Sequence, residues 1–350
     1  MIADLAVVVI ARNEEVRIRA SIAACLSSLQ RALVANLVRT WELVLVDSAS
    51  TDRTVEIAKE FPITIIKLGA DWPLSAAAGR FVGLRNTDSD LVLFVDGDYV
   101  LFDDWLPEAI RAIRKEQRIG AVCGRDVEEA TGDSLLMRFS KQSTESLVGE
   151  PEAIPIGLYR RQAITEVGGI HPFLRGGEDR DLACRLRAAG YQLLRINHVM
   201  GLHRWSDAGP LNFITYFRSV LVWSIGDGQS LRARFEFRPI RDAALRRYAN
   251  VRHLFNYMVG LVLVAFAIAN SALLSAAALP YVLLSDFALF LVLQSVRKRR
   301  GWTWRELLFR FHVVPYSIVR HSGFIAGFLF RPRDPLRYPT GEQISHGHHH

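Results

Sequence analysis

The first 120 residues alternate between short apolar runs and segments whose apolar residues recur at helical spacing. Four runs rich in β-branched residues are typical of buried strands: LAVVVI at 5–10, WELVLVD at 41–47, ITIIKL at 63–68 and LVLFVD at 91–96. The segments that follow them predict helices: about fifteen residues from Glu14, a stretch from about Thr51, Ser75 to Asn86, and Asp104 to Gln117. This alternation predicts an α/β fold with right-handed crossovers and a mostly parallel sheet covered by helices on both faces.

Polar side chains follow three of the predicted strands at the point where each strand ends. In such a sheet, ligands bind outside the carboxyl ends of the strands. Three strands therefore deliver acid and amide groups to one edge of the sheet. These groups are Asn13 with Glu14, Asp47 with Ser48, and Asp96 with Asp98.

The strand at 91–96 ends in two aspartates separated by one glycine. Carboxylates as close as those of Asp96 and Asp98 repel each other unless a cation lies between them. Hard divalent ions such as Mg²⁺ and Mn²⁺ favour oxygen ligands shared with a phosphate. The alternative is a plain turn after a strand, where Asp and Gly are common.

Two further segments carry candidate chemistry. Glu178, Asp179 and Asp181 stand at the start of a predicted helix, where acids stabilise the helix dipole or, alternatively, one of them acts as a general base. His203 is either a packed histidine or a further metal ligand. Beside it, Arg204 and Trp205 have the chemistry to bind a phosphate and stack on a ring.

The C-terminal third differs in composition from the rest. Residues 254–285 carry no charged side chain, and a shorter apolar piece with Asp286 follows and ends at RKRR, 297–300. With basic residues on both sides, the pattern predicts a transmembrane hairpin whose two ends face the cytoplasm, with a single long helix or a re-entrant pair as alternatives. The mixed aromatic and basic residues at 302–330 suit a segment lying in the membrane interface.

The composition suggests that some part of the protein meets lipid. The chain has 350 residues, 50% of them hydrophobic, and a formal net charge of +7. The positive charge is concentrated beside the apolar segments, and this distribution argues against nucleic-acid binding. The three cysteines have no metal-ligand spacing and read as reduced cytosolic thiols. Because no signal segment opens the chain, we expect its front to stay inside the cell.

These motifs together resemble the family 2 glycosyltransferases of GT-A fold. The resemblance covers roughly residues 5–206, and it rests on six motifs in order: VVVIARNEE, ELVLVDSASTDRT, GRFVGL, LVLFVDGD, GGEDRDLACRLRAAGY and LHRW. It implies a nucleotide-sugar donor, such as a UDP- or GDP-sugar, and Mn²⁺ or Mg²⁺ as cofactor. Two positions depart from the pattern: Phe81 replaces a commoner Asn, and Ser48-Ala49-Ser50 replaces a commoner Asp-Gly-Ser.

The resemblance also implies a role for each matching residue. Asp179, within the Glu178-Asp179 pair, matches the catalytic base of inverting members. Asp98 and His203 match metal ligands, and Asp96 lies near the ribose and the metal. The remaining matches concern the nucleotide: Asn13, Glu14, Asp47 and Arg80.

The sequence therefore predicts an inverting, metal-dependent glycosyltransferase at the cytoplasmic membrane, with its catalytic domain on the cytoplasmic side. The expected acceptor is a hydroxyl of a lipid-linked saccharide or glycolipid, as in polysaccharide or glycolipid synthesis. A polyprenyl-phosphate glycosyltransferase resembling dolichol-phosphate-mannose synthase, a nucleotidyltransferase and a non-catalytic scaffold are the alternatives. The expected segments are a GT-A domain at 1–230, a basic amphipathic linker at 231–253, a transmembrane hairpin at 254–296, interfacial helices at 297–340 and a tail with a tag remnant at 341–350.

Overall fold

The computed structural model describes residues 3–128, 150–203, 213–234, 313–330 and 332–345. These residues fall into two compact units. The first comprises residues 1–212 and 332–350, and the second comprises residues 213–331.

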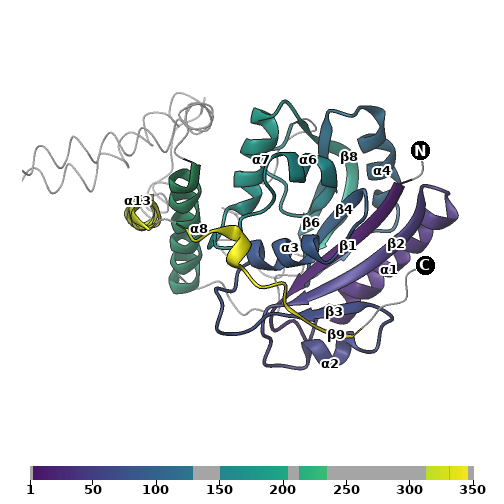
Figure 1. The fold of residues 1–350 in the computed structure, drawn as a ribbon, viewed down its shortest axis with the longest axis horizontal. Helices are drawn as coiled ribbons and strands as arrows, with labels where there is room; N and C mark the ends of the chain where they lie inside the picture. Colours follow the sequence, from purple (N-terminus) through teal and green to yellow (C-terminus); the bar gives the residue numbers. More distant parts are fainter. Residues whose placement is uncertain (1–2, 129–149, 204–212, 235–312, 331, 346–350) are drawn as a thin grey trace, which may run out of the picture. The chain divides into compact units, whose positions relative to one another are not determined.

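The first unit is built on one nine-stranded sheet with the strand order β5-β8-β6-β7-β4-β1-β2-β3-β9 (Figure 1). Helices α1, α2 and α4 pack together on one face, and α3, α6 and α7 lie on the other. The strands are β1 Ala3–Ala11, β2 Val38–Asp47, β3 Thr64–Lys67, β4 Leu91–Asp96, β5 Tyr99–Leu101, β6 Ile119–Glu128, β7 Gly157–Arg160, β8 Gln192–His203 and β9 Glu342–Ser345. The helices are α1 Ile18–Val34, α2 Thr54–Ala58, α3 Ala76–Arg85, α4 Trp105–Lys115, α6 Arg161–Glu166 and α7 Glu178–Ala188, with a 3-10 turn, η2, at Pro335–Arg337.

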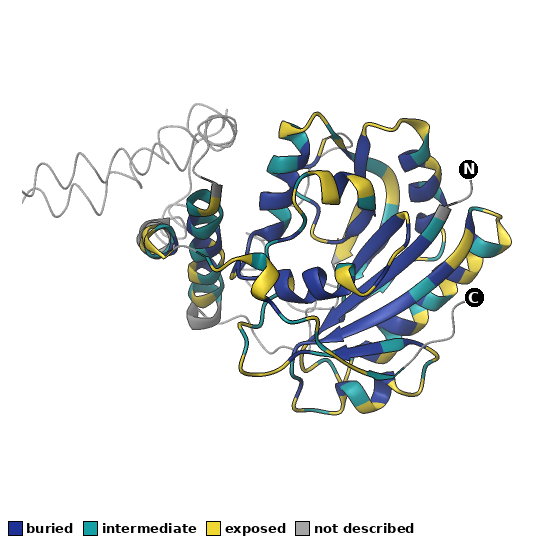
Figure 2. Cartoon of the chain, in the orientation of Figure 1, coloured by how far each residue is buried: buried dark blue, intermediate teal, exposed yellow. Residues whose placement is uncertain are grey.

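The four strands predicted from the apolar runs are confirmed, and they pair in parallel in the order β3-β2-β1-β4. Their continuous apolar sequences fit this position, because helices cover both faces of the sheet. Figure 2 shows these strands as the buried centre of the unit, and residues 5–9 of β1 have no exposed surface. The predicted start of α3 is also confirmed, since the Ser75 hydroxyl accepts a hydrogen bond from the Ala78 amide, 3.2 Å away.

The prediction of a mostly parallel sheet needs correction, because the sheet is mixed. β7 runs antiparallel to both β4 and β6, β5 runs antiparallel to β8, and β9 runs antiparallel to β3. These three strands have three or four residues each, too short to show a periodicity in the sequence. Their pairing depends on tertiary contacts and not on local pattern.

The second unit contains two described helices, α8 Phe213–Arg234 and α13 Val313–Leu329, which pack against each other. Glycines make this packing close: a Cβ at Gly228 would collide with the Phe324 carbonyl, and one at Gly327 with the Ile225 carbonyl. An ion pair between Arg320 and Asp227, 3.5 Å apart, also joins them. Small residues four apart, as at Gly323 and Gly327, allow helix backbones to approach closely.

Within the described ranges, no helix combines the length and apolar character needed to cross a bilayer. The predicted hairpin at 254–296, most of the linker at 231–253 and the first part of the interfacial region at 297–312 lie outside the described residues. The C-terminal part differs from the expected boundaries. Residues 332–345, predicted to be interfacial helix and tail, belong to the first unit and contain η2 and β9.

Candidate functional site

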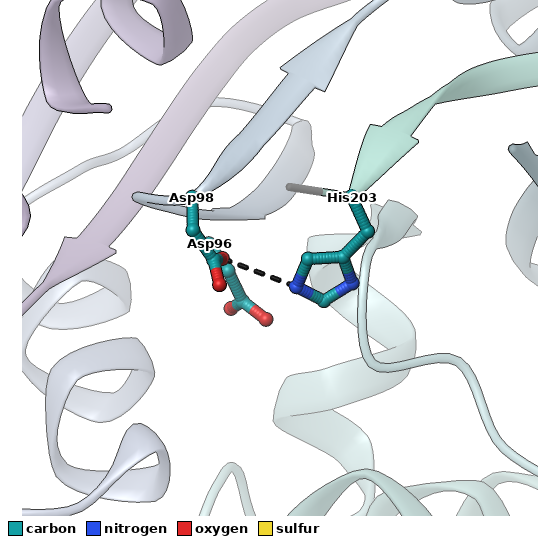
Figure 3. A group of neighbouring side chains, drawn as sticks. All are labelled: Asp96, Asp98 and His203. Atoms are coloured by element: carbon teal, nitrogen blue, oxygen red, sulfur yellow. Dashed lines mark hydrogen bonds and ion pairs between the residues drawn. The ribbon is translucent and has the colours of Figure 1, made fainter. Parts of the chain in front are cut away.

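Asp96, Asp98 and His203 form a cluster at the carboxyl end of the central strands (Figure 3). Asp96 is the last residue of β4, and Asp98 follows in the turn to β5. Antiparallel pairing of β5 with β8 sets Tyr99 opposite His203 and so brings the histidine to the aspartates. One side-chain ligand atom from each of the three residues lies within 4.8 Å of the others, and His203 Nε2 is 3.2 Å from Asp98 Oδ1.

The charges in this cluster are coupled. Burial raises the pKa of Asp96, and the neighbouring Asp98 carboxylate adds to this shift while Arg80 opposes it. Burial also acts to raise the pKa of Asp98, but the hydrogen bond and charge of His203 outweigh it, so the pKa of Asp98 is lowered. Of the two aspartates, Asp98 is therefore the one whose ionised form is favoured. Two carboxylates and an imidazole make a donor set that fits a divalent ion such as Mn²⁺ or Mg²⁺.

Tyr99 and Asp126 support His203, and the sequence analysis missed both. The Tyr99 ring is fully buried and meets the His203 ring edge to face, with centroids 5.7 Å apart. Its hydroxyl donates a hydrogen bond of 2.6 Å to Asp126 Oδ1, in β6. In the sequence, only the position of Tyr99 directly after the paired aspartates indicated that it belongs to the site. Asp126 lies in a segment with no motif.

Arg80 joins Asp96, at the end of β4, to helix α7. Its Nη2 donates to Asp96 Oδ1 at 2.8 Å, and its Nη1 donates to Glu178 Oε1. Arg80 and Glu178 are both buried, and burial raises the pKa of Glu178 although Arg80 opposes the shift. Arg80 thus has two protein partners, and its predicted contact with the nucleotide stays a prediction.

The first turn of α7 presents three acids, and they differ in their surroundings. Gly177, with φ of 71°, precedes the helix and turns the chain into it. Glu178 pairs with Arg80, and Asp181 forms an ion pair with Arg185 at 2.7 Å. Asp179 is half-buried and forms no ion pair or hydrogen bond with another described side chain. Of the three acids, Asp179 is therefore the one best placed to accept a proton from a ligand.

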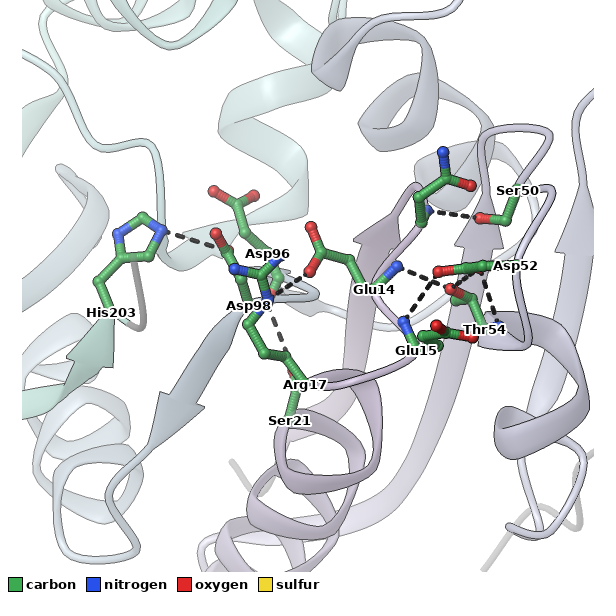
Figure 4. Close-up of polar contacts among 11 residues, drawn as sticks. Glu14, Glu15, Arg17, Ser21, Ser50, Asp52, Thr54, Asp96, Asp98 and His203 are labelled. Atoms are coloured by element: carbon green, nitrogen blue, oxygen red, sulfur yellow. Dashed lines mark hydrogen bonds and ion pairs between the residues drawn. The ribbon is translucent and has the colours of Figure 1, made fainter. Parts of the chain in front are cut away.

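Asn13 and Glu14 shape the loop after β1. The Asn13 amide donates to Ser50 Oγ at 2.9 Å, and its side-chain oxygen accepts from the Thr51 amide at 2.9 Å. The Glu14 amide donates to Thr54 Oγ1 at 2.7 Å (Figure 4). These bonds tie the loop after β1 to the loop after β2, at the edge where the sequence predicts nucleotide binding.

The Glu14 carboxylate receives a hydrogen bond of 2.7 Å from Arg17 Nε. Burial raises the pKa of Glu14 to about 7, the Asp98 carboxylate adds to the shift and Arg17 opposes it. Negative charge is therefore costly at this edge of the sheet in the absence of a ligand. A cation bound near Asp98 would reduce that cost.

Asp47 ends β2 and is fully buried. One carboxylate oxygen, Oδ2, accepts from the Ser50 amide at 3.0 Å, while Oδ1 has no hydrogen-bond partner among the described residues. A buried oxygen without a hydrogen-bond partner is unfavourable, and a hydrogen-bond donor on a ligand is one way to supply that partner. Ala49, which follows in the loop, has φ of 55°, a conformation that suits the glycine common at this position in the family pattern.

Phe81 is the other departure from the family pattern, and its packing explains the apolar side chain. Its side chain is buried, and its ring meets the ring of Tyr338 edge to face, with centroids 6.1 Å apart. Tyr338 belongs to the C-terminal segment, so Phe81 packs that segment against the core of the first unit. Arg204 and Trp205, the last two predicted binding residues, lie outside the described residues.

Comparisons with known proteins agree with this fold. Residues 6–164 match the family described as Glycosyl transferase family 2. The O-antigen chain rhamnosyltransferase WbaN of Salmonella anatum is 27% identical over 196 residues, which cover 50% of this chain and 60% of that protein. The glycosyltransferase AglE of Haloferax volcanii is 28% identical over 207 residues, covering 56% and 67%. The aligned regions thus span about three fifths to two thirds of these relatives.

A solved structure shares the fold. The mannosyltransferase PcManGT from Pyrobaculum calidifontis, in complex with GDP-Man and Mn²⁺, superposes with a TM-score of 0.57 at 18% identity, over 93% of this chain and 88% of that one. At this identity the likeness establishes the fold alone. The match over residues 6–164 leads to one conclusion: this part of the chain is a glycosyl transferase family 2 domain.

Proposed function

We propose that this chain transfers a sugar from a nucleotide-sugar donor to a hydroxyl of a membrane-associated acceptor, with inversion at the anomeric carbon. The observation that carries the proposal is the convergence of Asp96, Asp98 and His203 at the carboxyl edge of the sheet. Helix α7, with Asp179 in its first turn, is tied to the same place through Arg80.

The donor diphosphate would be held beside the aspartates. Asp98 and His203, with Asp96, would bind Mn²⁺ or Mg²⁺, which neutralises the charge that develops on the departing nucleoside diphosphate. Asp98 is suited to this role because its pKa is lowered and it stays ionised. The structure of PcManGT holds GDP-Man together with Mn²⁺, which supports the proposed combination of donor and ion.

Asp179 would take the proton from the acceptor hydroxyl as that oxygen attacks the anomeric carbon. Glu178 is less suited to this step, because its carboxylate is buried and already paired with Arg80. We assign Glu178 a positioning role: through Arg80 it fixes the start of α7 relative to Asp96. A single displacement assisted by one base inverts the anomeric centre.

The nucleoside would occupy the edge formed by the loops after β1 and β2. Asn13 and Glu14 shape this edge through their bonds to Ser50, Thr51 and Thr54. Asp47 would satisfy its unpartnered oxygen with a donor group of the base. Arg204 and Trp205 are proposed to complete the site by binding phosphate and stacking.

The acceptor is proposed to be lipid-linked, and the enzyme to lie at the cytoplasmic membrane with its catalytic unit on the cytoplasmic side. One relative, WbaN, is an O-antigen chain rhamnosyltransferase, which supports a role in polysaccharide synthesis. The uncharged stretch at 254–285 supports a membrane location. The close, glycine-based packing of α8 and α13 is also of a kind that membrane helices use.

Transfer of label from nucleotide sugars to lipid tests the proposal. Full-length protein in detergent is incubated with tritiated UDP-, GDP- and dTDP-sugars, Mn²⁺ and a bacterial lipid extract, and the organic phase is counted. We expect metal-dependent labelling that is lost in the Asp98→Ala variant. Mild acid should then release the label as a disaccharide or larger saccharide. Release as the monosaccharide would contradict the proposal, because it would identify polyprenyl phosphate as the acceptor.

A further inference from the structure

A pocket of about 540 Å³ opens at the carboxyl end of β3, in the first unit. Part of its wall comes from Lys67, at the end of β3, and from the loops that follow β2 and β3, including Ser50, Thr51 and Trp72. The rest comes from the far end of the chain, at residues 339–342. We call residues 338–342 the C-terminal wall. No motif in the sequence pointed to it.

The C-terminal wall is firmly built into the first unit. The Tyr338 side chain is buried, its hydroxyl donates to the Pro73 carbonyl at 2.8 Å, and its ring lies 5.6 Å from that of Trp72. Asn86 Nδ2 donates to the Thr340 carbonyl at 3.0 Å. Gly341 has φ of 83°, and a Cβ there would lie 2.5 Å from Ile66 Cγ2, so the tight course of the wall depends on glycine.

Strand β9 holds the wall in place from its other side. It pairs antiparallel with β3, setting Gln343 opposite Ile66, and the Ser345 hydroxyl donates to the Ile63 carbonyl at 2.9 Å. The wall therefore lies between two anchors, the buried Tyr338 ring and the β3–β9 pair. These two anchors make the C-terminal wall an integral part of the pocket.

The pocket is continuous with the proposed donor site. Its residues Ser50 and Thr51 are the ones that bond Asn13 in the loop after β1. β3 lies three strand positions from β4, which carries Asp96. At about 4.8 Å per strand the separation is roughly 14 Å. This separation is comparable to the length of an extended nucleoside diphosphate, so a diphosphate beside Asp98 would place its base in the pocket.

The lining has the chemistry to bind a nucleobase. The half-buried Trp72 ring offers an apolar surface for stacking. Lys67, Asp71 and Glu342 offer charged groups to the polar edge of a base. Glu342 comes from the C-terminal segment, so part of the recognition would depend on a residue more than 300 positions after the first nucleotide-binding motif.

We propose that the C-terminal wall closes the nucleobase subsite of the donor pocket and, with Glu342, helps to set which base is accepted. This inference rests on the proposed glycosyltransferase function and adds a specificity-determining segment to it. It predicts that a bulky side chain at position 340 obstructs the base without affecting the diphosphate.

Binding measurements on Thr340→Trp test this. Thr340 is exposed and its bond to Asn86 uses the backbone carbonyl, so the substitution leaves the anchor intact. Leu336→Trp is the matched control, since Leu336 is 79% exposed in the same segment and does not line the pocket. UDP, GDP, dTDP and inorganic pyrophosphate, each with Mn²⁺, are titrated by calorimetry into full-length wild type and both variants.

For Thr340→Trp we expect the dissociation constant of the preferred nucleoside diphosphate to rise about tenfold or more, because stacking and edge contacts to the base are lost. Pyrophosphate binding should be unchanged, which also shows that the variant is folded, and Leu336→Trp should match wild type. If wild type binds a nucleoside diphosphate and Thr340→Trp binds it equally well, the wall does not close the base subsite. If wild type binds no nucleoside diphosphate at all, the proposed function itself fails.

Discussion

Replacing Asp179 by asparagine is expected to lower kcat by about 10²- to 10⁴-fold, the usual contribution of a general base. The amide keeps the shape of the side chain but cannot accept a proton from the acceptor hydroxyl. Since Asp179 has no part in the Asp96–Asp98–His203 cluster, the affinity for the donor nucleotide should stay the same. Single-turnover transfer assays and nucleotide titrations on the same preparation separate the two effects.

Asp181→Asn is the matched control for this prediction. Asp181 lies two residues further along the same helix turn, but its buried carboxylate is paired with Arg185. The control should therefore lower the melting temperature while leaving kcat nearly unchanged. If the acids at the start of α7 served only the helix dipole, both variants would lose stability and neither would lose transfer activity. That result would overturn the assignment of Asp179 as base.

Replacing Arg80 by methionine is expected to destabilise the first unit by about 3–5 kcal/mol. The Arg80 side chain is 6% exposed, and its guanidinium neutralises the Glu178 and Asp96 carboxylates. Methionine fills much of the same volume but leaves the nearly buried Glu178 charge without its cation. Urea unfolding of the full-length protein, followed by tryptophan fluorescence, measures the change.

Two comparisons show whether the loss arises from buried charge. Arg19→Met removes an ion pair of similar length, 2.6 Å to Glu60, but both side chains there are more than half exposed. It should cost less than about 1 kcal/mol. Adding Glu178→Gln to Arg80→Met should recover part of the lost stability, because the unpaired buried charge is removed. A single Arg80→Met variant as stable as Arg19→Met would show that Arg80 does not organise the site.

The regular part of the fold could be predicted from the sequence because it rests on local patterns. The apolar runs that became β1 to β4 alternate with helical segments, and Ser75 has the residue type that caps a helix. Their parallel order then follows from crossover rules, which place Asn13, Asp47 and Asp96 at one edge. The edge of the sheet proposed to bind the nucleotide could therefore be predicted from the sequence alone.

The links that close the site could not be predicted in this way, because they join residues far apart in the chain. The Arg80–Glu178 pair spans 98 residues, and the Asp98–His203 contact spans 105. His203 was a candidate ligand from its residue type and from the family resemblance, but the β5–β8 pairing that positions it leaves no periodic pattern in the sequence. Strand β9 has only four residues and follows a long apolar region, which is why it was assigned to a tail.

The most direct test of the central claim is whether the protein binds a nucleotide sugar through a metal ion at Asp98. Thermal unfolding of the detergent-purified protein is followed with UDP-, GDP- and dTDP-sugars, first with Mn²⁺ and then with chelator. At a ligand concentration about 100 times the dissociation constant, binding adds about 2.7 kcal/mol to the free energy of unfolding. We expect stabilisation by one nucleotide class that disappears with chelator and in Asp98→Ala. Stabilisation that persists in Asp98→Ala, or none with any donor, would contradict this claim.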